Sequence, residues 1–173
     1  MALSLFLTSV TVDAKTVDRI AGIAGEHVVF LSDVRMRARV YMASQPDGDA
    51  LARARQEAKA MRASCEDLID EALVAEEAER RHLQVTEDEV SSAIDAVART
   101  NETDRASLMK MIRERGIVER DYRAMVRARV LDGKLLALVM PKDKRDDLEA
   151  ADKTMHDELR AQVYVEDRIA SAP

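Results

Sequence analysis

The chain has few of the residues that build covalent cross-links, tight turns or aromatic cores. Among its 173 residues there are one cysteine, three prolines, five glycines and no tryptophan, and aromatic residues make up 3%. A single cysteine, Cys65, excludes an intramolecular disulfide and a cysteine-based metal site. With so few aromatic side chains, the core must consist of Leu, Val, Ile, Ala and Met, which favours packed helices over a β-sandwich.

The sequence also lacks the local motifs of the common enzyme classes. It contains no glycine-rich phosphate loop, no His-Glu-x-x-His pattern and no Gly-x-Ser-x-Gly elbow. The histidines, His27, His82 and His156, show no ligand spacing, and the acidic residues between positions 66 and 71 have the spacing of a solvated helix face. We therefore predict no catalytic residues, no metal site and no cofactor.

The charge of the chain argues against general nucleic-acid binding. The formal net charge is −6 and the pI is near 5.2, whereas affinity for nucleic acid depends on cations that face phosphates. One feature keeps DNA binding open as an alternative, namely a series of arginines amid acidic residues in the second half of the chain: Arg113, Arg115, Arg120, Arg123, Arg127 and Arg129.

Both ends of the chain have the pattern of β-strands. Residues 17–24 and 28–31 flank a Gly25-Glu26-His27 turn, as in a hairpin, and residues 162–169 form a short β-branched and aromatic run. An isolated hairpin is marginally stable in water, so we expect the C-terminal strand to pair with it. That pairing predicts a single domain over residues 15–173.

Helical patterns fill the region between these strands. Ser32 is a candidate N-cap for a helix over residues 33–43, and a longer helix over 49–81 carries an apolar stripe through Leu51, Ala54, Ala58 and Cys65. The N-terminal half of this long helix, rich in Ala and Arg, is expected to extend beyond the compact body.

Four further helices follow. The first of them begins with a capping box at residues 86–89. The second is a short helix that Asp104 or Thr103 caps and that ends at Gly116. Residues 118–140 and 143–161 form the last two helices. The predicted fold class is mainly α: a bundle-like domain with a small antiparallel β-sheet formed by the N-terminal hairpin and the C-terminal strand.

The first fourteen residues need a separate interpretation. Residues 2–10 are apolar but too short to span a membrane, and Ala14 is the small residue that signal peptidase prefers. No Lys or Arg precedes Lys15, so the basic region of a secretory signal is missing. Residues 1–14 are therefore a truncated or weak signal, or else a buried N-terminal arm. We favour export and expect no stable membrane insertion.

Three stretches together resemble one known family. The first stretch, residues 17–34, reads VDRIAGIAGEHVVFLSDV. The second consists of residues 68–78 and 85–90 together with Tyr122-Arg123 in the late helix. The third, residues 158–165, reads ELRAQVYV. In this order and spacing they resemble the N-terminal domain of the SurA-type periplasmic chaperones, including the C-terminal helix and strand that complete it.

The resemblance implies a fold, a location and a function. In that family a helical module is closed by a small sheet that joins both termini, and a groove binds unfolded outer-membrane protein segments in the periplasm. Parvulin-type prolyl isomerase domains normally lie between the late helix and the C-terminal helix. Here only residues 141–144 bridge that gap, so no isomerase residues can be carried over and we expect no enzyme.

The leading hypothesis is thus an ATP-independent periplasmic holdase whose partners are unfolded or extended polypeptides. Methionine suits surfaces that accept varied partners. The candidate peptide-binding residues are Met36, Val40, Tyr41, Met109, Ile112, Tyr122 and Met125. The alternative is a structural or assembly protein that uses the same helical surface for a homodimer or for docking to one fixed partner.

Overall fold

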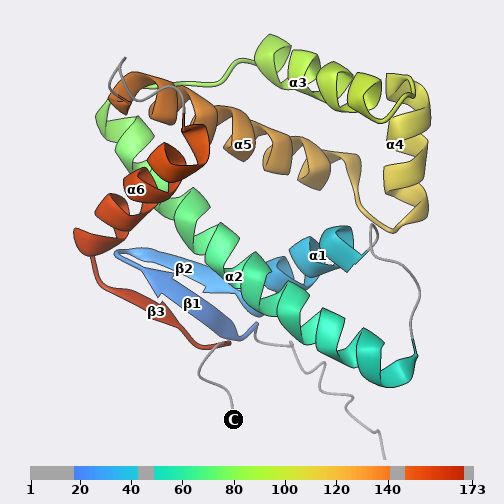
Figure 1. Cartoon of the computed structure of the whole chain (residues 1–173), viewed down its shortest axis with the longest axis horizontal. Helices are drawn as coiled ribbons and strands as arrows, with labels where there is room; N and C mark the ends of the chain where they lie inside the picture. The colour runs from blue at the N-terminus through green and yellow to red at the C-terminus, as the bar shows by residue number, and fades with distance from the viewer. Residues whose placement is uncertain (1–17, 43–48, 141–146, 170–173) are drawn as a thin grey trace, which may run out of the picture.

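The computed structural model describes residues 18–42, 49–140 and 147–169. Within these ranges the chain forms six helices and three strands, so the predicted mainly helical class with a small sheet is confirmed (Figure 1). The expected signal or arm at residues 1–14, the start of the hairpin at Val17 and the bridge at 141–144 lie outside the described residues.

The two ends of the described chain meet in one antiparallel sheet. Strands β1 (Ile20–Ala24), β2 (His27–Phe30) and β3 (Val165–Asp167) are arranged in the order β2-β1-β3. Ile23 lies opposite Val28 on one side and Glu166 on the other. Gly25 turns the hairpin with a φ of +57°, and its N–H donates to the Tyr164 carbonyl at 2.9 Å. The predicted pairing of both ends is confirmed.

Helix α1 (Leu31–Met42) follows β2 without a loop, and its start differs from the prediction. Ser32 is not the N-cap, because it already lies in the first helical turn. Asp18 takes that role: its carboxylate accepts the Ser32 N–H at 3.3 Å and also the Ser32 hydroxyl. The hairpin brings Asp18 to this helix end, where the Leu31 N–H donates to the Arg19 carbonyl at 2.7 Å.

Helix α2 (Ala50–Arg80) is the longest element and runs diagonally across the molecule (Figure 1). Asp49 caps it as a good N-cap residue should, accepting the Ala52 N–H. Of the predicted stripe, Cys65 is buried, whereas Ala54 and Ala58 are exposed. The buried residues of the helix are Ala60, Ser64, Cys65, Ile69, Leu73, Val74 and Ala78. No residue of α2 before Ala60 is buried, in agreement with the expected extension.

Helices α3 (Glu87–Thr100) and α4 (Arg105–Glu114) have the ends that local sequence predicts. Thr86 and Glu89 form the capping box of α3, and the Asp104 side chain caps α4. Gly116 then reverses the chain with a φ of +75°, as a glycine past a helix end commonly does.

Helices α5 (Glu119–Val139) and α6 (Leu148–Ala161) complete the described chain. Helix α5 packs on α2, α3, α4 and α6, and α6 packs on α2 before it leads into β3. Asp147 caps α6, accepting the Ala150 N–H at 3.0 Å.

The buried side chains form two clusters that α5 connects. The first lies between the sheet, α1, α2, α6 and the C-terminal part of α5, and Ile69 and Leu135 are fully buried in it. The second joins α3, α4 and the start of α5 around Ile94, Ile112 and Tyr122. Val40 of α1 packs against this second cluster, so α1 contributes to its margin.

Candidate functional site

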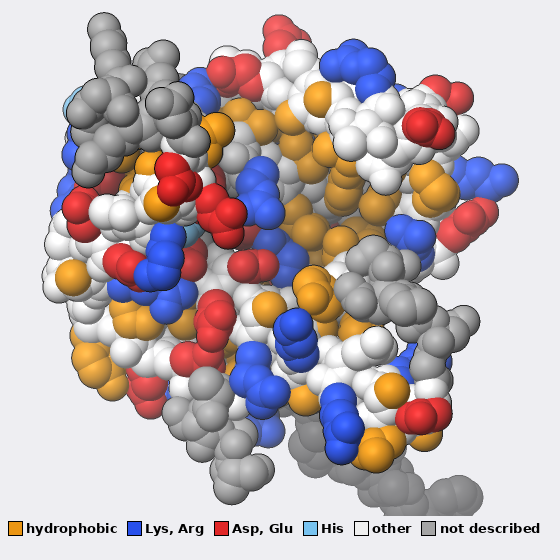
Figure 2. Space-filling view, in the orientation of Figure 1, with side chains coloured by type: hydrophobic (Ala, Val, Ile, Leu, Met, Phe, Trp, Pro, Cys, Tyr) orange, Lys and Arg blue, Asp and Glu red, His pale blue; other side chains and the backbone are white. Residues whose placement is uncertain are grey.

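A cleft lies between α1 and α5, over the middle of α2. It has two adjoining parts with volumes of about 460 Å³ and 360 Å³, and both are lined by Arg37, Glu71 and Met125. We call the two parts together the interhelical cleft. In Figure 2 hydrophobic side chains gather in a hollow between α3 and α4 on one side and α1 on the other, with basic side chains around its margin.

Nine of the 22 residues that line the interhelical cleft are apolar. Met36 and Leu68 line the part nearer to α1, while the part nearer to α6 adds apolar residues from three helices: Val74, Val97, Tyr122, Val126 and Ala128. Met36 and Met125 are half-buried, so their thioethers remain partly open to the cleft. Flexible, polarisable side chains of this kind adapt to ligands of varied shape.

A charged pair forms the polar wall of the cleft. The Arg37 guanidinium donates to the Glu71 carboxylate in a two-pronged contact, Nη1 to Oε1 at 2.6 Å and Nη2 to Oε2 at 2.7 Å. The side chains are only 13% and 27% exposed, so this contact is better shielded from solvent than a surface ion pair. The buried Arg37 Nε has no hydrogen-bond partner among the described residues.

The structure separates the predicted peptide-binding residues into three groups. Met36, Tyr122 and Met125 line the interhelical cleft, although Tyr122 is also a core residue, and desolvation by burial raises the pKa of its hydroxyl. Val40 packs at the margin of the second cluster, and Tyr41 is exposed. Met109 and Ile112 lie inside the second cluster at 7% and 5% exposure. Their role in peptide binding stays a prediction.

Sequence reasoning missed the polar wall and much of the apolar lining. Arg37 and Glu71 are 34 positions apart on two helices, and no local pattern connects them. Leu68, Val74 and Val97 belong to apolar stripes, but a stripe does not reveal which of its members face a cleft and which face a core.

Most of the arginines considered for nucleic-acid binding lie against carboxylates. Arg123 and Arg127 both donate hydrogen bonds to the Glu87 carboxylate. These bonds lower the pKa of Glu87, and the bond from Arg123 has the larger effect. Arg120 pairs with Asp121, and Arg113 with Glu119. Such pairing reduces the cationic character that phosphate binding needs and does not favour nucleic acid as a partner.

The fold defines a class of protein: a helical domain with an open cleft that is closed by a sheet from both ends of the described chain. The chain belongs to the SurA-like N-terminal domain family, whose family model matches residues 9–136. That family is associated with periplasmic chaperone function, and its domain is of a non-catalytic, chaperone type. A comparison with curated proteins found no match.

The family match covers α1 to most of α5, including the helical walls of the interhelical cleft formed by α1, α2 and α5. Helix α6 and strand β3 lie beyond the matched residues. Strand β3 nevertheless pairs with β1, which belongs to the matched residues. In the described parts of the chain, none of the helices combines the length and the apolar character needed to cross a lipid bilayer.

Proposed function

We propose that this protein is an ATP-independent periplasmic holdase that binds unfolded, exported polypeptides in the interhelical cleft. The observation that supports this most is the combination of half-buried, adaptable side chains, Met36 and Met125, with a fixed polar pair, Arg37 and Glu71, in one open cleft. Membership of a chaperone-associated family supports the same conclusion. Clients include outer-membrane proteins before their assembly, and binding needs no catalytic step.

The cleft suits an extended apolar segment better than a small rigid ligand. The lining is contributed by several helices, and it combines apolar side chains with charged groups such as Arg37 and Asp121. A client segment could place side chains on the methionines while its backbone amides and carbonyls meet the charged groups. Binding of this kind tolerates many sequences because no single pocket dictates one side chain.

A charge placed in the cleft tests the proposal. Met125→Glu puts a carboxylate at the junction of both parts, where a bound apolar segment would desolvate it. Met111→Glu is the matched control, because Met111 is the same residue type on α4, is 36% exposed and does not line the interhelical cleft.

The two variants and the wild type are compared for suppression of aggregation of a urea-unfolded porin, with affinity for a fluorescent client peptide measured in parallel. We expect the wild type and Met111→Glu to suppress aggregation, and Met125→Glu to bind at least about tenfold more weakly, the effect of about 1.4 kcal/mol. Melting temperatures are recorded for all three. Failure of the wild type to protect the client at molar excess would contradict the chaperone function, and equal affinities would contradict this cleft.

A homodimer or a fixed docking partner is the second candidate, and one observation favours it. Leu51 is 62% exposed in the first turn of α2, a stretch in which no residue before Ala60 is buried. Light scattering over a hundredfold range of protein concentration distinguishes the two functions. A constant monomer mass together with client binding supports the holdase, and a stable dimer without client binding supports the assembly protein.

A further inference from the structure

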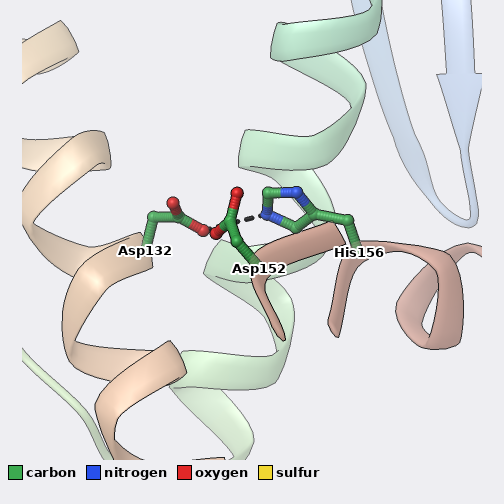
Figure 3. A group of neighbouring side chains, drawn as sticks. All are labelled: Asp132, Asp152 and His156. Carbon is green, nitrogen blue, oxygen red and sulfur yellow. Dashed lines mark hydrogen bonds and ion pairs between the residues drawn. The ribbon is translucent and has the colours of Figure 1, made fainter. Parts of the chain in front are cut away.

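Three potential metal ligands meet where α5 packs against α6. Asp132 comes from α5, while Asp152 and His156 come from α6 and lie four positions apart, on the same helix face and one turn from each other (Figure 3). One ligand atom from each of the three residues lies within 4.8 Å of the other two. The sequence showed no ligand spacing for His156, because one of its neighbours here is 24 positions away.

The distances fit an ion of the size of Zn²⁺. The His156 Nε2 and the Asp132 Oδ1 are 2.9 Å apart. Around a tetrahedral Zn²⁺, with ligand bonds of about 2.0–2.2 Å, two donor atoms lie about 3.3–3.5 Å apart. His156 and Asp132 would therefore move slightly apart, and Asp152, whose ligand atom lies within 4.8 Å of theirs, would turn toward the ion.

The Asp152 carboxylate is the strongest indication that the cluster is more than an ion pair. The contact between His156 and Asp132 on its own resembles an ordinary salt bridge. Asp152 points at the same place, yet it forms no hydrogen bond or ion pair within the described parts of the chain. A second carboxylate held beside Asp132 is repelled by it, and a divalent cation between them removes that repulsion.

The surroundings leave space for an ion, and the lining there includes the cation Arg129 as well as the three candidate ligands. All three residues line the part of the interhelical cleft nearer to α6, and Asp152 and His156 also line a wider hollow of about 810 Å³ on the other side. Water can thus reach the cluster and complete the coordination of an ion. On α2, the Asp70 Oδ1 already accepts a hydrogen bond from the Arg160 Nε at 2.6 Å, so Asp70 is not counted among the three ligands.

We propose that Asp132, Asp152 and His156 bind one divalent transition-metal ion, with Zn²⁺ the best match for one imidazole and two carboxylates. Three protein ligands and a water are a common zinc arrangement. The ion would hold α6 against α5 and, through α6, would support the strand β3 that closes the sheet. This inference does not depend on the proposed chaperone function, because binding is measured without a client.

The test is calorimetric titration of the tag-free, EDTA-treated full chain with ZnCl₂. We expect one ion per chain and, at a free zinc concentration about a hundred times the Kd, a rise in melting temperature of about 5–10 °C. Asp152→Asn is the key variant, because it removes a ligand charge but breaks no contact within the described residues, so folding should be intact. We expect it to weaken zinc binding at least about tenfold.

Asp157→Asn is the matched control on the same helix. Asp157 is exposed, pairs with Lys153 and is not one of the three ligands, so its variant should bind zinc like the wild type. A magnesium excess should not displace zinc, because Mg²⁺ prefers oxygen ligands and octahedral geometry. The proposal is overturned by the absence of stoichiometric binding, by equal affinity of Asp152→Asn and Asp157→Asn, or by displacement of zinc by magnesium at comparable concentration.

Discussion

Gly22 of β1 lies where the sheet packs closely against α2. A Cβ atom at this position would be 3.0 Å from the Ile69 Cδ1, 3.3 Å from the Cys65 Sγ and 3.3 Å from the Glu166 carbonyl oxygen. The Cys65 thiol itself donates to the Ala21 carbonyl at 3.5 Å, and burial raises its pKa to about 12. Small residues at this contact allow strand and helix to pack directly.

Alanine substitutions at two glycines separate packing from backbone entropy. Gly22→Ala should lower the free energy of unfolding by about 1–3 kcal/mol, because the added methyl group overpacks the contact. Gly133→Ala in α5 is the matched control. Apart from the nearby backbone of α5 itself, no atom of the described residues lies within 4 Å of the added Cβ, so the substitution should raise the free energy of unfolding by about 0.5–1 kcal/mol. Urea denaturation measures both. Equal stability of Gly22→Ala and wild type would contradict the close approach.

At the scale of elements, β3 is short but well held. The Arg168 N–H donates to the Ala21 carbonyl at 2.9 Å, and the Gly25 N–H donates to the Tyr164 carbonyl at 2.9 Å. The hairpin therefore has a third strand along one side, and Val163 and Val165 pack against the first cluster. A hairpin without such support is marginally stable in water.

Deletion of residues 163–169 should therefore destabilise the whole domain. It removes the pairing of β3 with β1 and three apolar side chains from the margin of the core, Val163, Val165 and Ile169, so we expect the melting temperature to fall by about 5 °C or more. Tyr164→Ala is the control, since its side chain is 68% exposed and a surface change should shift the melting temperature by less than about 2 °C. An unchanged melting temperature of the deletion variant would contradict the closure of the sheet.

At the scale of the whole molecule, two buried clusters share one helix. The first cluster includes Leu135 near the end of α5, and the second includes Tyr122 near its start. A helix that is packed at both ends cannot lose one cluster without loosening its contacts with the other. We therefore infer that the described fold unfolds as one cooperative unit rather than as two subdomains.

Alanine substitutions in the two clusters test this cooperativity. Leu135→Ala and Ile94→Ala remove side chains that are 0% and 1% exposed, and each should cost about 2–5 kcal/mol. Both variants should retain one transition, with midpoints that coincide in circular dichroism and in tyrosine fluorescence. A separate early transition in Ile94→Ala would show that the second cluster unfolds independently.

The elements could be predicted wherever their signals were local. Thr86 and Glu89 cap α3 as predicted, Asp104 caps α4, and the glycine turn of the hairpin forms at Gly25. The start of α1 was wrong because its true cap, Asp18, lies 14 positions away from Ser32 and reaches it only through the hairpin. Boundaries that depend on a distant partner are not visible in a local pattern.

The candidate site was predicted only in part, for a related reason. Met36 and Met125 line the interhelical cleft, whereas Met109 and Ile112, chosen on the same grounds, lie inside the second cluster. All four are apolar residues on helical stripes, and their sequence environments are alike. The rotation of each helix about its axis decides which apolar side chains fill a core and which remain open.

By itself the sequence determined the mainly helical class, the strands at both ends, most helix boundaries and the family resemblance. These features arise from hydrogen bonds, backbone preferences and apolar spacing within a few residues, so a linear pattern records them. Only the tertiary structure decided that Arg37 meets Glu71 across the cleft and that His156 meets Asp132 and Asp152. Such contacts depend on how helices pack and rotate, and that arrangement minimises the exposed apolar surface of the whole chain at once.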